Sequence, residues 1–290
     1  MVRIPNILTI AGVDPSGGAG VLADVKAISA LGGYACAVVA ALTAQNTRAV
    51  AGVSPVDAQF VALQIDTLLG DVKLDAAKIG MLGEAQVIET VADRLAHWHM
   101  APIVLDPVMV AKSGDALLAK AAVGALVEAL LPQATIITPN LPEAGVLLRA
   151  RPVDTIREMY RVAERLRGLM RGEGARWVYL KGGHLPGEEM TDLLHDGDRM
   201  IELNARRIAT RNTHGTGCTL SAALATLLPQ TDSVPNAARR AKAYVSEAIA
   251  RADELAVGGG HGPVHHFHAL WAGSREKPSD PFDPDRAYRR

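Results

Sequence analysis

The chain has 290 residues, of which 49% are hydrophobic and 21% are charged, and its formal net charge is −1. This is the composition of a globular protein with enough apolar residues for a sizeable core, and the balanced charge gives no reason to expect nucleic acid or a membrane surface as a partner. Residues 1–9 lack the features of a signal peptide, and no apolar run reaches the about 20 residues that cross a bilayer, so we expect a cytoplasmic protein. Cys36 and Cys218 stand in such different surroundings that they do not indicate a disulfide framework.

Short apolar runs alternate with helical patterns along most of the chain. The first run, residues 7–11, leads through a glycine-rich loop into a helical pattern that ends at Leu31. Further strands are predicted at residues 34–42, 77–81, 103–105, 136–138 and 178–180. Helices are predicted at residues 57–69, 85–98, 119–131 and 155–170. This alternation predicts βαβ units and a mostly parallel sheet with helices on both faces.

The pattern changes in the last third of the chain. Residues 191–206 form two short strand patterns around Asp196-Gly197-Asp198, which predicts a β-hairpin. Two further helices are predicted at residues 217–228 and 236–255. Residues 272–290 are rich in Pro, Asp and Arg and lack apolar periodicity, so we predict one domain over residues 1–271 followed by a disordered tail.

Chemically useful side chains follow the ends of several predicted strands. They are Asp14, Gln45, Met81, Asp106, Asn140, Glu143 and Lys181. The carboxyl ends of parallel strands meet at one edge of an open sheet, and ligands bind at that edge. We therefore expect these side chains to contribute to one site.

The stretch Asn212–Ser221 reads N-T-H-G-T-G-C-T-L-S and predicts an anion-binding loop. Gly215 and Gly217 let the backbone turn closely around a ligand, and a helix that begins near Gly217 would point free N–H groups and its positive dipole end at the same place. Such a place suits phosphate. Cys218 would lie in the first helical turn, where a helix N-terminus lowers the pKa of a thiol. The spacing matches neither the Walker pattern nor G-x-G-x-x-G, and a tight loop that simply enters a helix is the alternative.

Three of the strand-end residues allow two interpretations each. Asp106 could hold a cation or orient a water, or it could cap a turn. Glu143 could form a capping box with Asn140, or it could bind, through water, a Mg²⁺ carried by nucleotide phosphates. Lys181, which two glycines follow, could neutralise phosphate charge or lie at the surface.

Histidines suggest two further sites, and neither is favoured. His214 and Cys218 could form a thiol nucleophile and its base, but no third orienting group is evident, so a hydrolase or acyl-transfer site is disfavoured. The cluster H-G-P-V-H-H-F-H at residues 261–268 could bind a metal. A structural role or a place at the edge of a ligand site is favoured for it, since the chain has no C-x-x-C.

Nine short segments, in order within residues 4–271, carry a resemblance to a known family. They are A-G-V-D-P-S-G-G-A-G (11–20), A-Q-N-T-R (44–48), K-I-G-M-L (78–82), D-P-V-M (106–109), K-S-G-D (112–115), T-P-N-L-P-E (138–143), K-G-G-H (181–184), N-T-H-G-T-G-C-T-L-S (212–221) and G-P-V-H-H-F-H (262–268). This very specific combination resembles the hydroxymethylpyrimidine kinase/phosphomethylpyrimidine kinase family of thiamine biosynthesis, within the ribokinase superfamily.

The resemblance implies an α/β fold, a ribokinase-like three-layer α/β/α sandwich with a mostly parallel central sheet, and two ATP-dependent reactions. The first phosphorylates the hydroxyl of 4-amino-5-hydroxymethyl-2-methylpyrimidine, and the second converts that monophosphate to the diphosphate. Mg²⁺ would accompany the ATP. The resemblance also implies a homodimer.

The resemblance further implies roles for individual residues. The pyrimidine pocket would be lined by Asp24, Gln45, Met81 and Val108. The anion hole would be formed by Gly215, Thr216, Gly217 and Cys218, and Cys218 stands where most ribokinase relatives have the aspartate that takes the hydroxyl proton. The nucleotide would lie over Lys181, Thr213, Asn140 and the segment near His261. The metal would lie near Glu143 and Asp106.

Two alternatives stay open beside this assignment. One is pyridoxal kinase, because some proteins with this scaffold phosphorylate pyridoxal. The other is a pyrimidine-binding regulator that has kept the pocket and lost catalysis. The intact G-T-G-C, together with Asp106, Asn140 and Glu143, argues against the regulator.

Overall fold

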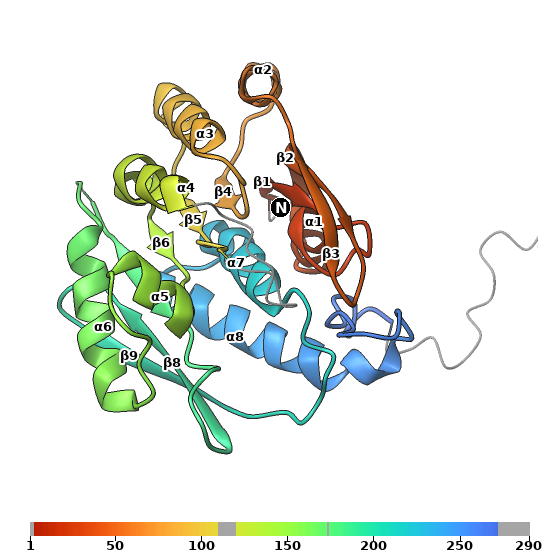
Figure 1. Cartoon of the computed structure of the whole chain (residues 1–290), viewed down its shortest axis with the longest axis vertical. Helices are drawn as coiled ribbons and strands as arrows, with labels where there is room; N and C mark the ends of the chain where they lie inside the picture. The colour runs from red at the N-terminus through yellow and green to blue at the C-terminus, as the bar shows by residue number, and fades with distance from the viewer. Residues whose placement is uncertain (1–2, 110–119, 173, 272–290) are drawn as a thin grey trace, which may run out of the picture.

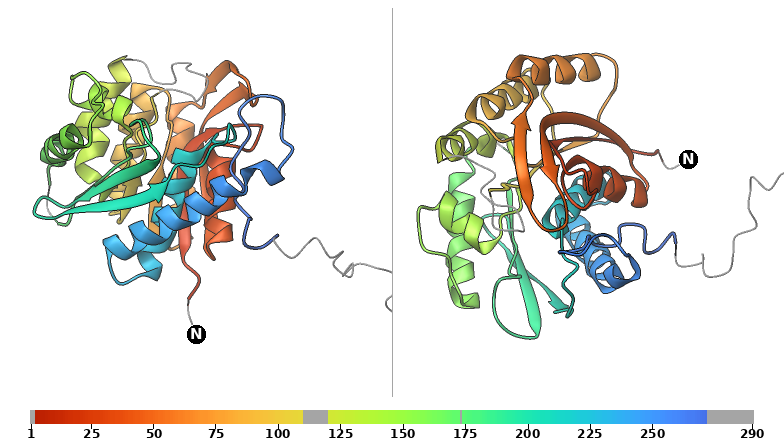
Figure 2. Two further views of the ribbon diagram at one scale, coloured as in Figure 1. Left: turned by 90° about the horizontal axis from the view of Figure 1, so that it is seen from below. Right: turned by 45° about the vertical axis from the view of Figure 1, so that its right-hand side comes forward.

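The computed structural model describes residues 3–109, 120–172 and 174–271, which form one nine-stranded sheet with helices on both faces (Figures 1 and 2). The strands, in chain order, are β1 (Asn6–Val13), β2 (Tyr34–Gln45), β3 (Val50–Pro55), β4 (Ala76–Ile79), β5 (Ile103–Leu105), β6 (Ile136–Ile137), β7 (Trp177–Leu180), β8 (Glu189–His195) and β9 (Met200–Arg206). Their order across the sheet is β3-β2-β1-β4-β5-β6-β7-β8-β9. The neighbouring central strands β2, β1, β4, β5, β6 and β7 run parallel. At the edges, β3 pairs antiparallel with β2, β8 with β7, and β9 with β8.

The helices of the described residues divide into two layers. They are α1 (Gly20–Ala30), α2 (Ala58–Leu69), α3 (Ala85–His97), α4 (Lys120–Ala125), α5 (Leu141–Leu147), α6 (Ile156–Leu169), α7 (Thr216–Leu227) and α8 (Val234–Ala250). One core cluster joins the sheet to the layer of α2 to α6, and the other joins it to α1, α7 and α8. The predicted three-layer α/β/α sandwich is confirmed.

The parallel strands are apolar on both faces because helices cover both faces. In β1, Leu8 and Ile10 belong to one core cluster and Ile7 to the other. In β7, Val178 and Leu180 face the first cluster, and Trp177 and Tyr179 face the second. This double burial explains why these strands appear in the sequence as continuous apolar runs.

The structure differs from the prediction mainly at the sheet edge and in two helices. β2 continues past residue 42 to Gln45, because Ala44 and Gln45 pair with β3, an edge strand that the sequence did not predict. The helix predicted at 119–131 is α4 followed by a π-helical turn, Leu126–Leu130, and a short 3₁₀ turn. The helix predicted at 236–255 is α8, which begins two residues earlier and ends at Ala250.

Other predicted elements are confirmed to within a few residues. Asp57 caps α2 by accepting hydrogen bonds from the N–H groups of Gln59 and Phe60, and β8 and β9 form the hairpin expected around Gly197. In the part of the chain that the structure describes, no helix is both long and apolar enough to cross a membrane. The predicted disordered tail, 272–290, and the segment 112–115 lie outside the described residues.

Candidate active site

A cavity of about 630 Å³ opens at the carboxyl ends of the parallel strands. Its wall contains the residues that the sequence predicts for the site, except Asp24 and the segment near His261. These residues are Gln45, Met81, Asp106, Val108, Asn140, Glu143, Lys181, Thr213, Gly215, Thr216, Gly217 and Cys218. The strand ends and the glycine loop therefore contribute to one site, as the topology of an open sheet requires.

Asp24 lies behind the cavity wall, which corrects its predicted place in the pocket lining. It is fully buried on α1, where its Oδ2 accepts hydrogen bonds from Thr9 Oγ1 at 2.6 Å and from Lys78 Nζ at 2.7 Å. A buried carboxylate needs such a partner. The sequence did not identify Lys78, although a lysine inside an apolar strand is a signal for a buried ion pair.

The glycine loop forms the start of α7, as predicted. Gly215 has φ 73°, and a Cβ on it would lie 1.7 Å from the carbonyl oxygen of Gly18, so only glycine fits there. A Cβ on Gly217 would lie 3.1 Å from Lys181 Nζ and 3.6 Å from Asp106 Oδ2. The first turn of α7, where a helix leaves N–H groups without intrahelical partners, thus lies beside a lysine and a carboxylate.

Lys181 joins two carboxylates at this point. Its Nζ lies 3.1 Å from Asp106 Oδ1 and 3.8 Å from Glu143 Oε2. Asp106 also accepts hydrogen bonds from Thr138 Oγ1 at 3.0 Å and Ser221 Oγ at 3.3 Å. Burial lowers the pKa of Lys181, but the two carboxylates outweigh burial and raise this pKa above its usual value. Lys181 is therefore a fixed positive charge, and it is not a surface lysine.

Glu143 has both structural and electrostatic contacts. It forms the capping box of α5 with Asn140, with hydrogen bonds of 2.7 and 2.8 Å between the side chain of each residue and the backbone N–H of the other. Burial raises the pKa of Glu143 to about 7, against the attraction of Lys181. The contacts with Asn140 and Lys181 both use Oε2, so the other oxygen is available to a hydrated cation. Carboxylate oxygens are ligands that Mg²⁺ prefers.

Cys218 lies in the first turn of α7, but its predicted acidity is wrong. Burial raises the pKa of the thiol to about 11, helped by Asp24 and Asp106 and opposed by Lys78 and by a hydrogen bond from the Gly20 N–H. The helix N-terminus does not compensate for this loss of solvent. The sequence could not reveal it because the charged groups that act on the thiol lie in distant segments.

The opposite end of the cavity is positioned by two β-bulges. One has its extra residue, Ala51, in β3 opposite Ala44 and Gln45, and the other has its extra residue, Ala40, in β2 opposite Ala11 and Gly12. Bulges re-aim side chains at strand ends. Gln45 Oε1 accepts a hydrogen bond from Thr43 Oγ1 at 3.3 Å, and Gln45 shares the cavity wall with Met81 and Val108, so a polar amide faces apolar side chains.

A family model described as phosphomethylpyrimidine kinase matches residues 14–265. This chain belongs to the phosphomethylpyrimidine kinase family. It is 52% identical over 271 residues to the hydroxymethylpyrimidine/phosphomethylpyrimidine kinase of Escherichia coli K12, covering 93% of this chain and all of that protein. It is 46% identical over 264 residues to a thiamine biosynthesis bifunctional protein of Geobacter sulfurreducens, covering 91% of this chain and 52% of that protein.

Solved structures of related kinases share the fold. The ADP complex of Bacillus subtilis pyridoxal kinase matches with a TM-score of 0.84 and 32% identity, covering 92% of this chain and 99% of that one. The chain is therefore similar in fold to a pyridoxal kinase. Its family is assigned from the sequence match and not from this similarity of fold.

The cavity continues beyond Lys181 over residues that the sequence analysis missed. They are Met190, Asp192, Arg206, Arg207, Ile208, Lys242, Val245, Ser246 and Ile249. Asp192 accepts hydrogen bonds from the Gly182 N–H at 2.8 Å, Tyr179 Oη at 2.9 Å and Lys242 Nζ at 2.6 Å, so it fixes the segment that carries Lys181. The sequence does not indicate these residues as part of a site, because α8 and the hairpin show ordinary amphipathic patterns.

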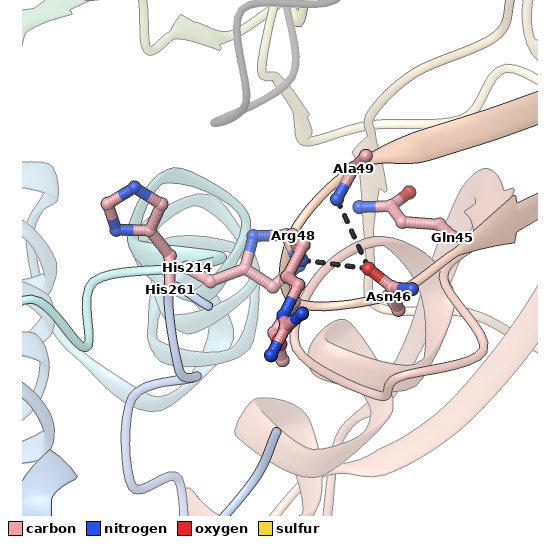
Figure 3. A pocket seen from close by; sticks show the side chains of 7 residues that line it. Gln45, Asn46, Arg48, Ala49, His214 and His261 are labelled. Carbon is pink, nitrogen blue, oxygen red and sulfur yellow. Dashed lines mark hydrogen bonds between the residues drawn. The ribbon is translucent and has the colours of Figure 1, made fainter. Parts of the chain in front are cut away.

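The segment near His261 lies elsewhere, which corrects its predicted place under the nucleotide. The His261 N–H donates to the Thr47 carbonyl oxygen at 2.8 Å, and its ring lines a small pocket with Gln45, Arg48 and His214 (Figure 3). In Figure 1 the blue C-terminal segment accordingly lies beside the loop between β2 and β3. His261 does not line the cavity around Lys181.

The other histidines of the C-terminal cluster pack against the start of α7. His266 Nε2 lies 3.0 Å from Thr219 Oγ1, and that hydroxyl donates to the Gly215 carbonyl oxygen at 2.8 Å. Burial lowers the pKa of His266 to about 3, so the ring is neutral near pH 7. Within residues 3–109, 120–172 and 174–271, no group of three or more His, Cys, Asp or Glu side chains could hold a metal ion.

Proposed function

We propose that this chain is an ATP-dependent kinase of thiamine biosynthesis that phosphorylates 4-amino-5-hydroxymethyl-2-methylpyrimidine and then its monophosphate. The observation that carries the proposal is that one cavity joins the Gln45 pocket, the anion loop and Lys181. A kinase needs an acceptor pocket and a nucleotide site that meet at a place where phosphate charge is stabilised. The family assignment supports the same reaction class.

The pyrimidine would lie at the Gln45 end. The amide of Gln45 offers one acceptor oxygen and two donor hydrogens, which complements the amino group and ring nitrogen of an aminopyrimidine. Met81 and Val108 would cover the ring faces. Asp24 would act from behind the wall, through Lys78, and would not contact the pyrimidine directly.

The phosphoryl group would transfer at the start of α7. Residues 215–218 would bind its oxygens through backbone N–H groups, and Lys181 would neutralise charge beside them. Glu143 and Asp106 would hold Mg²⁺ through water, and the ion would neutralise charge on the nucleotide phosphates. The nucleotide itself would extend over Asn140 and Thr213 toward the apolar side chains of α8.

The two reactions place different demands on Cys218. A hydroxyl gains from a base as it attacks, whereas a phosphate monoester is already largely ionised because its second pKa is about 6. With a thiol pKa of about 11, roughly one thiol in 10⁴ is ionised at pH 7. A base role for Cys218 therefore requires the first reaction, and only the first, to accelerate as the pH rises.

We also propose that the chain is a cytoplasmic homodimer. The strand β3 lies at one edge of the sheet, and the stretch from β2 to α2 exposes the apolar side chains Leu42, Val53 and Phe60. Exposed apolar side chains that gather near a sheet edge favour association with a second copy. Light scattering that reports a monomer at micromolar concentration would contradict this proposal.

The experiment that tests the function is ADP release with hydroxymethylpyrimidine and with pyridoxal, measured side by side. Pyridoxal is the alternative substrate to test, because the fold is similar to that of a pyridoxal kinase. We expect turnover of hydroxymethylpyrimidine to the diphosphate, with pyridoxal a poorer substrate. Turnover of pyridoxal alone would assign the chain to pyridoxal phosphorylation, and turnover of neither would favour a binding protein.

A further inference from the structure

Two glycine-rich loops interlock at the edge of the cavity. Residues 14–20 form one, and residues 213–218 form the other. A Cβ on Gly18 would lie 2.3 Å from the ring carbon Cδ2 of His214, and a Cβ on Gly215 would lie 1.7 Å from the Gly18 carbonyl oxygen. Each loop is therefore shaped to fit the other, with no room for a side chain between them.

A buried pair, Asp14 and His214, connects the two loops. His214 Nε2 lies 2.7 Å from Asp14 Oδ2, and the two side chains are only 7% and 3% exposed. Burial raises the pKa of Asp14, but the hydrogen bonds from His214 and Ser16 outweigh burial and lower this pKa below its ordinary value. Asp14 is therefore an ionised acceptor near pH 7, and the facing nitrogen of His214 carries a proton.

Each partner also organises its own loop. Asp14 accepts hydrogen bonds from the backbone N–H of Ser16 at 2.9 Å and of Ala19 at 3.0 Å. The His214 N–H donates to the Gly262 carbonyl oxygen at 3.0 Å, so the C-terminal segment holds His214 from behind. The pair is thus fixed on both sides.

The loop that Asp14 organises reaches the reacting centre. Ala19 and Gly20 line the same cavity as Cys218, and the Gly20 backbone opposes the rise in the pKa of the Cys218 thiol. A Cβ on Gly20 would lie 2.2 Å from the Gly12 carbonyl oxygen, so this residue has one allowed place. A shift of the loop therefore moves the part of the cavity wall that Ala19 and Gly20 form with the anion-binding loop.

We propose that His214 is a positioning residue, which acts through Asp14 to hold the 14–20 loop against the anion-binding loop. The inference rests on the proposed function, because it assigns His214 to the site where phosphate transfers. Both reactions use the same anion hole, so loss of His214 slows both equally. The residues proposed to contact the pyrimidine and the nucleotide directly are Gln45, Met81, Val108, Asn140 and Thr213, so we expect KM for either substrate to change less than kcat.

The test compares His214→Ala with His214→Gln, in which the amide nitrogen of glutamine replaces Nε2 as donor to Asp14. We expect His214→Ala to lower kcat of both reactions about 10²-fold, the effect of losing one oxyanion donor, with a smaller change in KM. His214→Gln restores kcat to within several-fold. His97→Ala, on the exposed end of α3, is the control. Wild-type kcat in His214→Ala, or a Gln variant as slow as Ala, would overturn the proposal.

Two further measurements keep the test independent of substrate and of stability. Hydrogen exchange of the peptide that spans residues 14–20 should accelerate in His214→Ala and stay at the wild-type rate in His214→Gln, whatever the enzyme phosphorylates. Asp14→Asn combined with His214→Ala should lose less activity than the product of the two single losses, because the contact between the two residues is lost in either variant. Unchanged exchange, or fully additive losses, would contradict the proposal. If exchange responds as expected but hydroxymethylpyrimidine is not phosphorylated, the proposed function fails while the loop pairing stands.

Discussion

Glu143 provides a prediction about stability that can be worked from the structure. Its pKa rises from an ordinary 4.5 to about 7 because it is buried, and each pH unit is worth about 1.4 kcal/mol, so ionising it in the folded state costs on the order of 3 kcal/mol. A raised carboxyl pKa contributes stability below pH 4.5 that is lost as the pH rises through 7. Glu143→Gln stays neutral and can still accept from the Asn140 N–H. We therefore expect this variant to be more stable than wild type by about 3 kcal/mol at pH 8, with almost no difference at pH 4.5.

Urea unfolding of both proteins at several pH values between 4.5 and 8 measures this difference directly. Glu89→Gln, on the exposed face of α3, is the matched control and should show no such trend. Glu143→Ala removes the cap as well and should be about 1 kcal/mol less stable than Glu143→Gln at every pH. A pH-independent difference between wild type and Glu143→Gln would refute the reasoning.

The same site yields three further predictions. Glu143→Gln and Asp106→Asn should both raise the Mg²⁺ concentration for half-maximal rate, and an unchanged magnesium dependence would leave Glu143 as a helix cap only. Gln45→Leu should weaken pyrimidine binding by about 1–3 kcal/mol, measured as KM, whereas an unchanged KM and kcat would remove Gln45 from the pocket. Lys78→Met should lower the unfolding free energy by about 3–5 kcal/mol because Asp24 is left buried without its partner, and adding Asp24→Asn should recover much of that loss; urea unfolding distinguishes this from an additive loss.

The layers and the site edge could be predicted from sequence because both follow from local patterns. Continuous apolar runs identify strands covered on both faces, and the residue after each run lies at the carboxyl edge. The start of α7 was predictable because glycines in a short loop before an apolar helix leave few alternatives. The edge strand β3 could not be predicted, because most of its residues are exposed and the strand therefore lacks an apolar pattern.

The errors concern groups whose environment depends on distant segments. Asp24 and Lys78 are 54 residues apart, and only the fold reveals that they neutralise each other behind the wall. The acidity of Cys218 depends on burial and on the charges of Asp24, Lys78 and Asp106, which are distant in the sequence, so the local helix start gave the wrong direction. The nucleotide end of the cavity was missed because its residues serve equally as the ordinary face of α8.

The most direct test of the central claim is the single-turnover rate of both phosphorylations in wild type and Cys218→Ala between pH 6 and 10. If the Cys218 thiolate is the base, the first reaction in wild type accelerates about tenfold per pH unit in this range, because its pKa of about 11 lies above it. Cys218→Ala then loses this dependence and about 10²–10⁴ in rate, while the second reaction is much less affected. Equal losses in both reactions, with a flat pH profile, would contradict the account and leave Cys218 as part of the anion hole alone.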